Sequence, residues 1–332
     1  MGEVARRAGV SSATVSRTLS GTRSVGPEIQ NRVFAAAEEL GYRINLIGRA
    51  LRQRRSSIVG LVVPDFDNPF FSTLAHHLSR VFAPSGIDLH MFSADGSLVS
   101  ELRGVQSFID RQVDALVVVP VHEVASQSNI ALAAAAVVTV QVDRRVPLTG
   151  GHFIGCSNRR GMRLIEEHVA ADVDTVRQPV TYIGAQPYSS SAHERLDGFR
   201  ACFGKRTPTL LGSFDPAWGQ EAASRLFEGG MRSGTIVTAA DIIAIGVLNR
   251  LQSLGLSIPE DFRVIGFDGT RIGQLVHPTL TTVRQPFEEM SQAIRDIIAA
   301  RLADPGSDQP RSTRVTPTLV VGETSPTAPN PR

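Results

Sequence analysis

The feature that most constrains the fold is a regular alternation of apolar, strand-length segments with helical segments from residue 57 onward. The first strand segments are SIVGLVVP, IDLHMF, DALVVVP and AVVTVQVD, and helical patterns occupy about 70–83, 98–111 and 122–134 between them. A second set follows, namely HFIGC, PVTYIG, TLLGSF, TIVTA and FRVIGFD. Because strand–helix–strand alternation builds parallel sheets flanked by helices, the two sets predict an α/β core of two similar lobes.

Polar and aromatic side chains follow several of these strands. In open α/β sheets, ligands bind at the carboxyl ends of the strands, and two facing lobes turn that edge into a cleft. Carboxylates, an arginine fork and aromatic faces predict a sugar or nucleoside site that contains Asp67, Phe70, Phe71, Asp143, Arg195, Phe214, Asp241 and Asp268. An aspartate after a strand is also a common helix cap, and Asp241 and Asp268 fit this second interpretation best.

The first fifty-five residues follow a different pattern, with three short helical segments. The first segment ends at Gly9, which can adopt a left-handed conformation, and Ser11 or Ser12 is a ready N-cap for the second. The third begins at Pro27. Two short helices joined by a tight turn predict a helix-turn-helix, with a shared core of Val4, Val10, Val15, Leu19, Val33 and Leu40.

The outward face of the second helix carries Ser12, Ala13, Ser16 and Arg17. Small side chains allow close approach to a groove, hydroxyls bond phosphates, and a guanidinium matches the O6 and N7 atoms of guanine. Residues 1–55 hold ten arginines and four glutamates, a net charge of +6, which leaves −4 for the remainder of a chain whose overall charge is +2. This asymmetry favours duplex DNA as the partner over the alternative, a helical hairpin with a solvated face.

This segment resembles the DNA-binding headpiece of the LacI/GalR repressor family. EVARRAGVSSATVSRTLSG matches the family's D-V-A-x-x-A-G-V-S-x-x-T-V-S-R-x-L-N-G nearly position by position. The resemblance implies that bases are read by Ser12, Ala13 and Arg17, and that the DNA backbone is held by Ser11, Thr14 and Ser16.

A second motif, ELGYRINLIGRALR, resembles the family's hinge, L-G-Y-x-P-N-x-x-A-R-x-L. The resemblance implies DNA contacts for Asn45 and Arg49, and it makes Leu51 an apolar wedge in the minor groove at the centre of a palindromic site. Ile44 replaces the customary proline and Gly48 the customary alanine. Glycine costs a helix about 1 kcal/mol relative to alanine, so we expect this hinge to be helical only when two copies pair on DNA.

The resemblance extends through the core to about Thr324, with the landmarks IVGLVVPDFDNPFF, VDALVVVP, VDRR, RLDGF, ADIIAIGVL, GFDG and HPTLTTVRQP. It implies a periplasmic-binding-protein-like core whose effector cleft is lined by Phe70, Phe71, Arg195, Phe214, Asp241 and Asp268. Ala240 replaces a common asparagine and Ser157 a common aspartate, which leaves fewer partners for hydroxyl groups. The expected effector is a sugar or sugar derivative, and a nucleobase or nucleoside is the next choice.

The expected domains are a headpiece over 1–43, a hinge over 44–55, a core over 56–324 and a disordered, proline-rich tail over 325–332. We expect the chain to cross between lobes near 155–158, 281–286 and 305–315, so that lobe 1 spans about 56–155 and 284–304 and lobe 2 about 156–281 and 310–324. The tail lacks apolar heptads, so a homodimer is expected. The resemblance then implies a cytoplasmic repressor that binds a palindromic operator as a dimer under the control of a small-molecule effector.

Two other classes of protein fit less well. A secreted sugar receptor with the same core needs a signal peptide, and MGEVARRAGV has no apolar segment of that kind. An enzyme needs a nucleophile with its base, a metal set or a phosphate loop, and the sequence shows none, so no catalytic residue, metal or cofactor is expected. No apolar run could cross a bilayer, and Cys156 and Cys202 lack metal-ligand spacing and are expected to be reduced.

Overall fold

The computed structural model describes residues 1–20, 25–42, 55–147, 151–171, 178–304, 306 and 310–327. The chain divides into two compact units, Met1–Ser56 and Ser57–Arg332. Within the described residues, no helix combines the length and apolar character that crossing a membrane requires.

The smaller unit is a three-helix cluster of α1 (Gly2–Ala8), α2 (Ser12–Ser20) and α3 (Pro27–Glu39). Gly9 ends α1 with a φ of 65°, and the Oγ of Ser11 accepts the Thr14 N–H at 3.1 Å, so Ser11 is the cap of α2. The buried residues are Val4, Ala5, Ala8, Val15, Val33, Ala36 and Ala37. The prediction for Leu40 was wrong, because this residue follows the last turn of α3 and is 40% exposed.

The first sheet of the larger unit is parallel throughout. Its spatial order is β11 (Ser312–Val315), β5 (His152–Cys156), β4 (Val138–Val142), β3 (Ala115–Val118), β1 (Ile58–Val63) and β2 (Asp88–Ser93). The inner strands β1, β3 and β4 are buried along nearly their whole length, which is typical of strands with helices on both faces.

The second sheet repeats this plan and ends in an antiparallel edge strand. Its spatial order is β12 (Thr318–Val320), β10 (Thr281–Arg284), β9 (Phe262–Asp268), β8 (Gly234–Thr238), β6 (Val180–Ala185) and β7 (Thr209–Gly212). Only the pairing of β12 with β10 is antiparallel among the described strands of this sheet.

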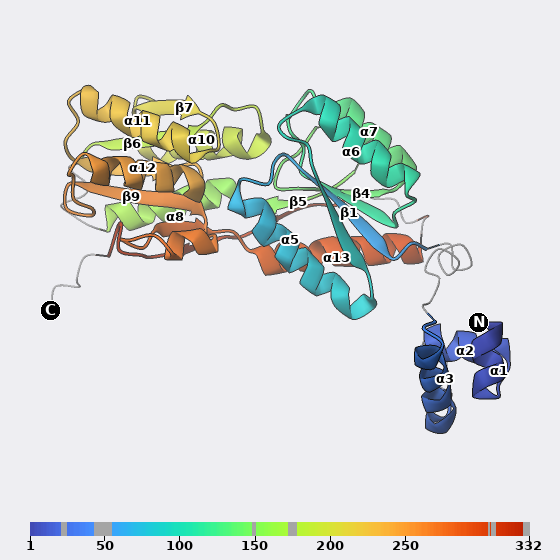
Figure 1. The fold of residues 1–332 in the computed structure, drawn as a ribbon. Coiled ribbons are helices and arrows are strands. Elements are labelled where there is room, and N and C mark those ends of the chain that lie inside the picture. The colour runs from blue at the N-terminus through green and yellow to red at the C-terminus, as the bar shows by residue number, and fades with distance from the viewer. Residues whose placement is uncertain are drawn as a thin grey trace. The chain divides into compact units, whose positions relative to one another are not determined.

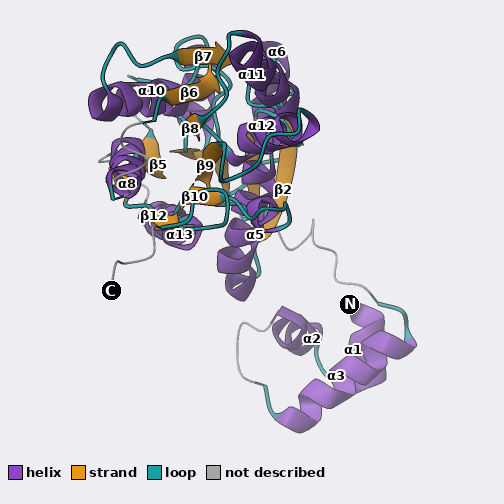
Figure 2. Cartoon of the chain, turned by 90° about the vertical axis from the view of Figure 1, so that its left-hand side faces the viewer, coloured by secondary structure: helices purple, strands orange, loops and turns teal. Residues whose placement is uncertain are grey.

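Helices cover both faces of each sheet (Figures 1 and 2). On the first sheet, one face packs against α5 (Pro69–Phe82) and α13 (Phe287–Ala303), and the other against α6 (Leu98–Asp110) and α7 (Gln127–Ala136). On the second sheet, one layer is α8 (Asn158–Ala170) and α10 (Ser190–Phe203), and the other is α11 (Pro216–Glu228) and α12 (Asp241–Ser253). Two short 3-10 helices are η1 (Ala83–Ser85) and η2 (Arg271–Gln274).

The chain passes between the two sheets after β5, after β10 and between β11 and β12. The third passage was predicted too early, because residues 310–324 were assigned to the second lobe and β11 belongs to the first sheet. Its sequence, STRV, is largely exposed at the sheet edge and carries no apolar run. A short polar edge strand gives almost no signal in the sequence.

The beginning of the predicted tail is also ordered. Ser325 is 1% exposed, and its carbonyl oxygen accepts the Nε2–H of His168 and the hydroxyl of Thr281, both at 2.9 Å. These bonds fix the chain end against α8 and β10. The prediction of disorder from Ser325 was therefore wrong for its first residues, and 328–332 lie outside the described part.

Candidate effector site and DNA-binding headpiece

Three charged side chains predicted from the sequence meet at the carboxyl ends of strands from both sheets. Arg195 extends from α10, Asp143 follows β4 and Asp268 ends β9. The Nη1 of Arg195 lies 3.1 Å from an Asp268 oxygen, and its Nη2 lies 3.6 Å from Asp143 Oδ1. All three side chains are buried, so one guanidinium bridges carboxylates of the two lobes.

Neighbouring groups hold Arg195 in this position. Its Nε donates to the side-chain oxygen of Asn158 at 3.0 Å, and Nη1 donates to the carbonyl oxygen of Ala239 at 2.7 Å. The guanidinium also lies 4.1 Å from the ring centroid of Phe267. Because these contacts leave the arginine little freedom, its charge is fixed where a ligand would meet it.

Both carboxylates belong to the five non-glycine residues in the described part of the chain that have a positive φ; the other three are Ser57, Asp95 and Gln112. Asp143 has a φ of 61° and Asp268 a φ of 120°, both in regions that side chains other than glycine rarely adopt. Such conformations cost about 1–3 kcal/mol each and persist where the surroundings impose them, often at binding sites.

Several buried polar atoms around this cluster have no hydrogen-bond partner among the described residues. They are Asp143 Oδ1, Arg144 Nε and Gln285 Oε1. The Nε2 of Gln285, by contrast, donates to Asp268 at 2.8 Å. A buried polar atom without a partner costs about 1–3 kcal/mol, so these atoms are well suited to a polar ligand that completes their bonds.

Aromatic rings from both lobes face Arg144. Its guanidinium lies 5.8 Å from the ring centroid of Phe71 on α5 and 5.5 Å from that of Phe214, which follows β7. Neither Arg144 nor Gln285 was predicted from the sequence. Each follows a strand closely, Arg144 after β4 and Gln285 after β10, and this position is the one signal in the sequence that could have suggested them.

Burial changes the protonation of the site. It raises the pKa of Asp268 to about 7, against the opposing effect of Arg195, and it raises the pKa of Asp241 to about 6. Burial also lowers the pKa of Arg144, partly offset by Asp143. A hydroxyl group that donates to Asp268 would favour its ionised form.

Asp241 supports the site from behind. One of its oxygens accepts the N–H and hydroxyl of Thr270 at 2.8 and 2.9 Å, and the other accepts the hydroxyl of Thr282 at 2.5 Å. Because both oxygens are engaged, the geometry fits a residue that positions the loop after β9. The alternative prediction of a helix cap was wrong for Asp241, because Ala240 is the N-cap of α12 and no side-chain cap bond is present there.

The remaining predicted effector residues lie close to α5. Asn68 caps this helix, with its side-chain oxygen accepting the Phe70 N–H at 3.0 Å. Phe70 is buried in the core of the first lobe, with its ring centroid 5.3 Å from that of Phe287, so it does not belong to the polar cluster. Asp67 is exposed. The residues that the structure brings together are thus Phe71, Asp143, Arg195, Phe214 and Asp268.

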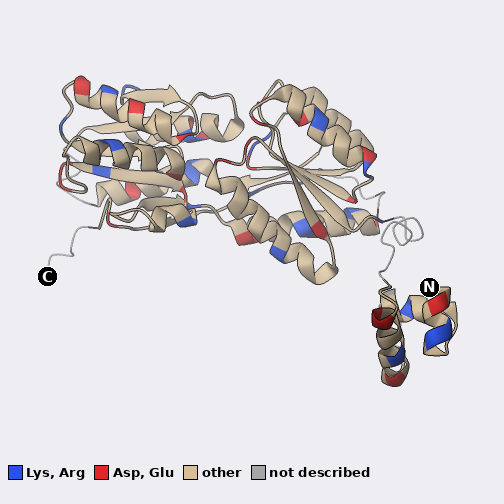
Figure 3. Ribbon diagram, viewed as in Figure 1, with Lys and Arg blue, Asp and Glu red and all other residues tan. Residues whose placement is uncertain are grey.

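In the headpiece, the predicted DNA-reading residues lie on α2. Ser12, Ala13 and Arg17 are exposed, Thr14 and Ser16 are partly exposed, and Arg17 is the sole charged residue of this helix. Acidic and basic side chains are instead interspersed along α3 (Figure 3). The predicted hinge contacts, Asn45, Arg49 and Leu51, lie outside the described residues.

Arg32 and Arg7 have structural partners within the headpiece. The Nε of Arg32 donates to the carbonyl oxygen of Ala8 at 3.0 Å, at the carboxyl end of α1. Arg7 forms an exposed ion pair with Glu39 at 2.5 Å. Within the described residues, no group of side chains is arranged to hold a metal ion.

Comparison with known proteins decides the family. The model for bacterial regulatory proteins of the lacI family matches residues 1–45, and that for the periplasmic binding protein-like domain matches 178–325. The HTH-type transcriptional regulator AscG of Escherichia coli K12 is 32% identical over 300 residues, which span 88% of each chain. The chain belongs to the LacI family. This LacI-family protein is a DNA-binding transcriptional regulator, as the sequence motifs predicted.

Two solved structures have the same fold. The lac repressor dimer bound to operator and the anti-inducer ONPF superimposes with a TM-score of 0.81 at 21% identity, covering 97% of this chain and 98% of that chain. The CelR–cellobiose complex gives a TM-score of 0.71 at 24% identity, with the same coverage of 97% and 98%. The predicted α/β, two-lobed fold of the LacI-family protein is confirmed, whereas the roles of single residues stay predictions.

Proposed function

We propose that this LacI-family regulator is a cytoplasmic repressor that binds a palindromic operator as a homodimer. A hydroxyl-bearing small molecule would either weaken or strengthen its binding to the operator. The headpiece 1–43 and the hinge 44–55 would bind DNA. The two lobes that begin at residue 56 would bind the effector. The lac repressor structure, a dimer bound to operator, supports this arrangement.

The observation that carries the effector proposal is the buried cluster of Asp143, Arg195 and Asp268 with its unpartnered polar atoms. Carboxylates accept hydrogen bonds from hydroxyl groups, and arginine donates to ring or hydroxyl oxygens. Phe71 and Phe214 supply apolar faces from opposite lobes. This chemistry suits a sugar or sugar derivative, and the cellobiose-bound CelR shows that a related fold takes a sugar. A nucleobase or nucleoside is the second candidate, because aromatic rings also stack on bases.

The DNA proposal rests on the exposed face of α2. Ser12, Ala13 and Arg17 would contact base edges in the major groove, where small side chains permit close approach. Ser11, Thr14 and Ser16 would bind the sugar-phosphate backbone. In the hinge, Asn45 and Arg49 would contact the DNA and Leu51 would enter the minor groove.

A secreted sugar receptor would not account for the DNA-binding family match at residues 1–45. The matched relatives are transcriptional regulators, so we propose no catalytic role. Effector and operator affinities would be linked, typically by about 1–3 kcal/mol, and the linkage is reciprocal.

A thermal-shift panel of sugars and nucleosides tests the effector proposal. A ligand present at 100 times its Kd is expected to stabilise the regulator by about 2.7 kcal/mol, and Asp268→Ala should abolish that shift while operator binding is retained. Asp67→Ala, which removes an exposed carboxylate near α5, is the matched control and should leave the shift unchanged. A shift that persists in Asp268→Ala would place the effector elsewhere.

A further inference from the structure

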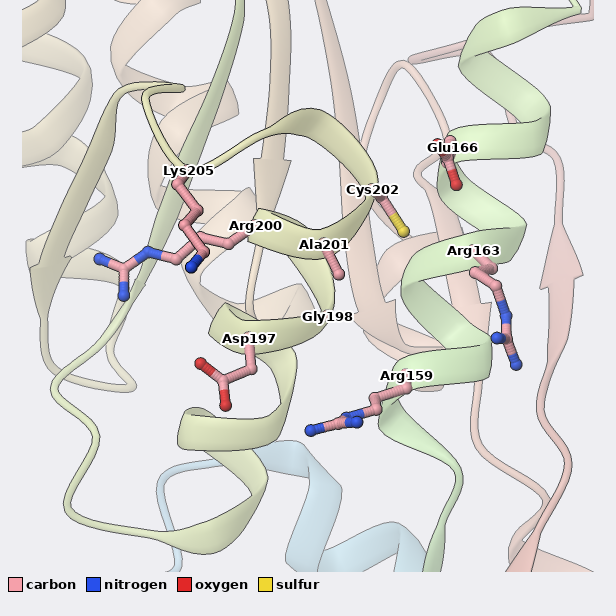
Figure 4. A pocket seen from close by; sticks show the side chains of 9 residues that line it. All are labelled: Arg159, Arg163, Glu166, Asp197, Gly198, Arg200, Ala201, Cys202 and Lys205. Atoms are coloured by element: carbon pink, nitrogen blue, oxygen red, sulfur yellow. The ribbon is translucent and has the colours of Figure 1, made fainter.

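A pocket lies between the lobe-2 helices α8 and α10. It has a volume of about 750 Å³, within the range of small-molecule sites, and it shares no lining residue with the effector cluster (Figure 4). The helices approach closely at Gly198, where an added Cβ would lie 3.1 Å from Met162 Cγ. The missing side chain at Gly198 leaves a shallow floor between the two helices.

Four cations line this pocket: Arg159 and Arg163 on α8, Arg200 on α10, and Lys205 just after it. None of the four forms a hydrogen bond or ion pair with another residue in the described part of the chain. Figure 4 shows the Arg159 side chain reaching from α8 toward α10, with Arg200 and Lys205 together on the far side of α10.

Two acids, Asp197 and Glu166, also line the pocket. Asp197 lies 3.5 Å from His193 one turn earlier on α10. Burial and the neighbouring Glu166 carboxylate raise the pKa of the Cys202 thiol to about 12. Four cations and two acids therefore line the pocket, an excess of two positive charges, whereas the neighbouring Arg160 pairs with Glu167 at 2.6 Å.

We propose that the α8–α10 pocket binds a small polyanion that carries phosphate or several carboxylate groups. Guanidinium groups bind both kinds of anion through paired N–H donors, and the excess of two positive charges in the lining favours a ligand with about two negative charges. The pocket adjoins the effector cluster through the same helices, because Asn158 begins α8 and Arg195 lies on α10. A bound anion would thus contact the two helices that hold Arg195.

The experiment measures binding of pyrophosphate and of citrate to the full-length protein at constant ionic strength. Thermal stability and the rate of thiol alkylation are the two readouts. Cys202 is half-buried in the pocket wall, and Cys156 on β5 is fully buried and serves as an internal reference by peptide mass spectrometry. One of the two anions, at millimolar concentration, should raise the melting temperature and slow alkylation of Cys202 severalfold.

The variants locate the site. The double variant Arg159→Gln with Arg200→Gln should weaken anion binding about tenfold or more, because each substitution removes a charge-assisted hydrogen bond to the anion. Arg160→Gln removes the same charge from the same helix, outside the pocket, and should leave binding within twofold of the wild type. Preference for pyrophosphate or for citrate identifies the anionic group.

Three results would overturn the proposal. One is that neither anion changes melting temperature or Cys202 alkylation. Another is that Arg160→Gln weakens binding as much as the double variant, which would show general screening of surface charge. The third is that the double variant lowers affinity for random duplex DNA while anion binding is absent, which would assign these cations to DNA.

Discussion

At the scale of single residues, the effector cluster depends on one arginine between two carboxylates. Arg195 bridges Asp143 and Asp268, all three side chains are buried, and removing one member of such a group leaves an uncompensated buried charge. Residues that follow strands were predictable members of the cluster, because the carboxyl ends of parallel strands meet at one edge of a sheet. Arg144 and Gln285 were not predicted, since their importance depends on rings and oxygens supplied by other segments.

The raised pKa of Asp268 predicts a pH-dependent stability. Between about pH 4 and its native pKa of about 7, the folded protein keeps a proton on this carboxyl that the unfolded chain releases. The stabilising contribution is therefore complete below about pH 4 and is lost as pH rises through 7, at up to about 1.4 kcal/mol per pH unit. Asp268→Asn should remove this slope, so its stability relative to wild type should increase from pH 5 to pH 8.

Urea unfolding at several pH values measures this difference. Asp67→Asn, at an exposed carboxylate, is the control and should run parallel to the wild type. A stability difference between Asp268→Asn and wild type that stays constant with pH would contradict the assigned protonation.

Substitution of Arg17 tests whether the headpiece contacts base edges of the operator. Arg17→Ala should cost about 1–3 kcal/mol on an operator selected from random duplexes and leave weak, salt-sensitive binding to other DNA. Arg7→Ala removes an equal charge from α1, where Arg7 pairs with Glu39, and should preserve the preference for the operator. Fluorescence anisotropy measures both, and equal losses of Arg17→Ala on operator and random DNA would argue against base contact.

At the scale of elements, the strands buried on both faces were predictable and the polar ones were not. The strands β1, β3, β8 and β9 are visible in the sequence as apolar runs. β11 and the chain end at Ser325 are ordered by contacts with distant segments, β5 and His168, which no local pattern reveals.

The conformation of the loop between β3 and α7 could not be predicted from the local sequence pattern either. Glu101 on α6 is fully buried and accepts from the Val121 N–H at 2.7 Å, the Ser126 hydroxyl at 3.0 Å and the Asn129 side chain at 2.8 Å. The same loop reaches the second lobe, where the Glu123 N–H donates to the Tyr188 carbonyl oxygen at 2.7 Å. Glu101 thereby fixes a contact between the lobes.

Glu101→Ala should destabilise the protein by about 3 kcal/mol or more, since three donors, two of them buried, lose their acceptor. It should also speed amide hydrogen exchange at Glu123. Val99→Ala on the same helix, at a side chain that is 79% exposed, should change stability by less than about 0.5 kcal/mol. Unchanged exchange at Glu123 in Glu101→Ala would show that the loop is held by other contacts.

At the scale of the whole molecule, effector control requires that ligand and DNA affinities be linked through the two lobes. The polar cluster joins the lobes through Arg195, and Arg144 lies between rings of both, so a ligand there would contact each lobe at once. Such a ligand can favour one arrangement of the lobes over another only if its contacts differ between them.

The most direct measurement is operator affinity, by fluorescence anisotropy at fixed salt, with and without a saturating effector found in the thermal-shift panel. We predict a change of about 5- to 150-fold for the wild type, equal to about 1–3 kcal/mol, and none for Asp143→Ala. An Asp143→Ala protein that melts like the wild type and keeps the full response to effector would contradict control through this cluster.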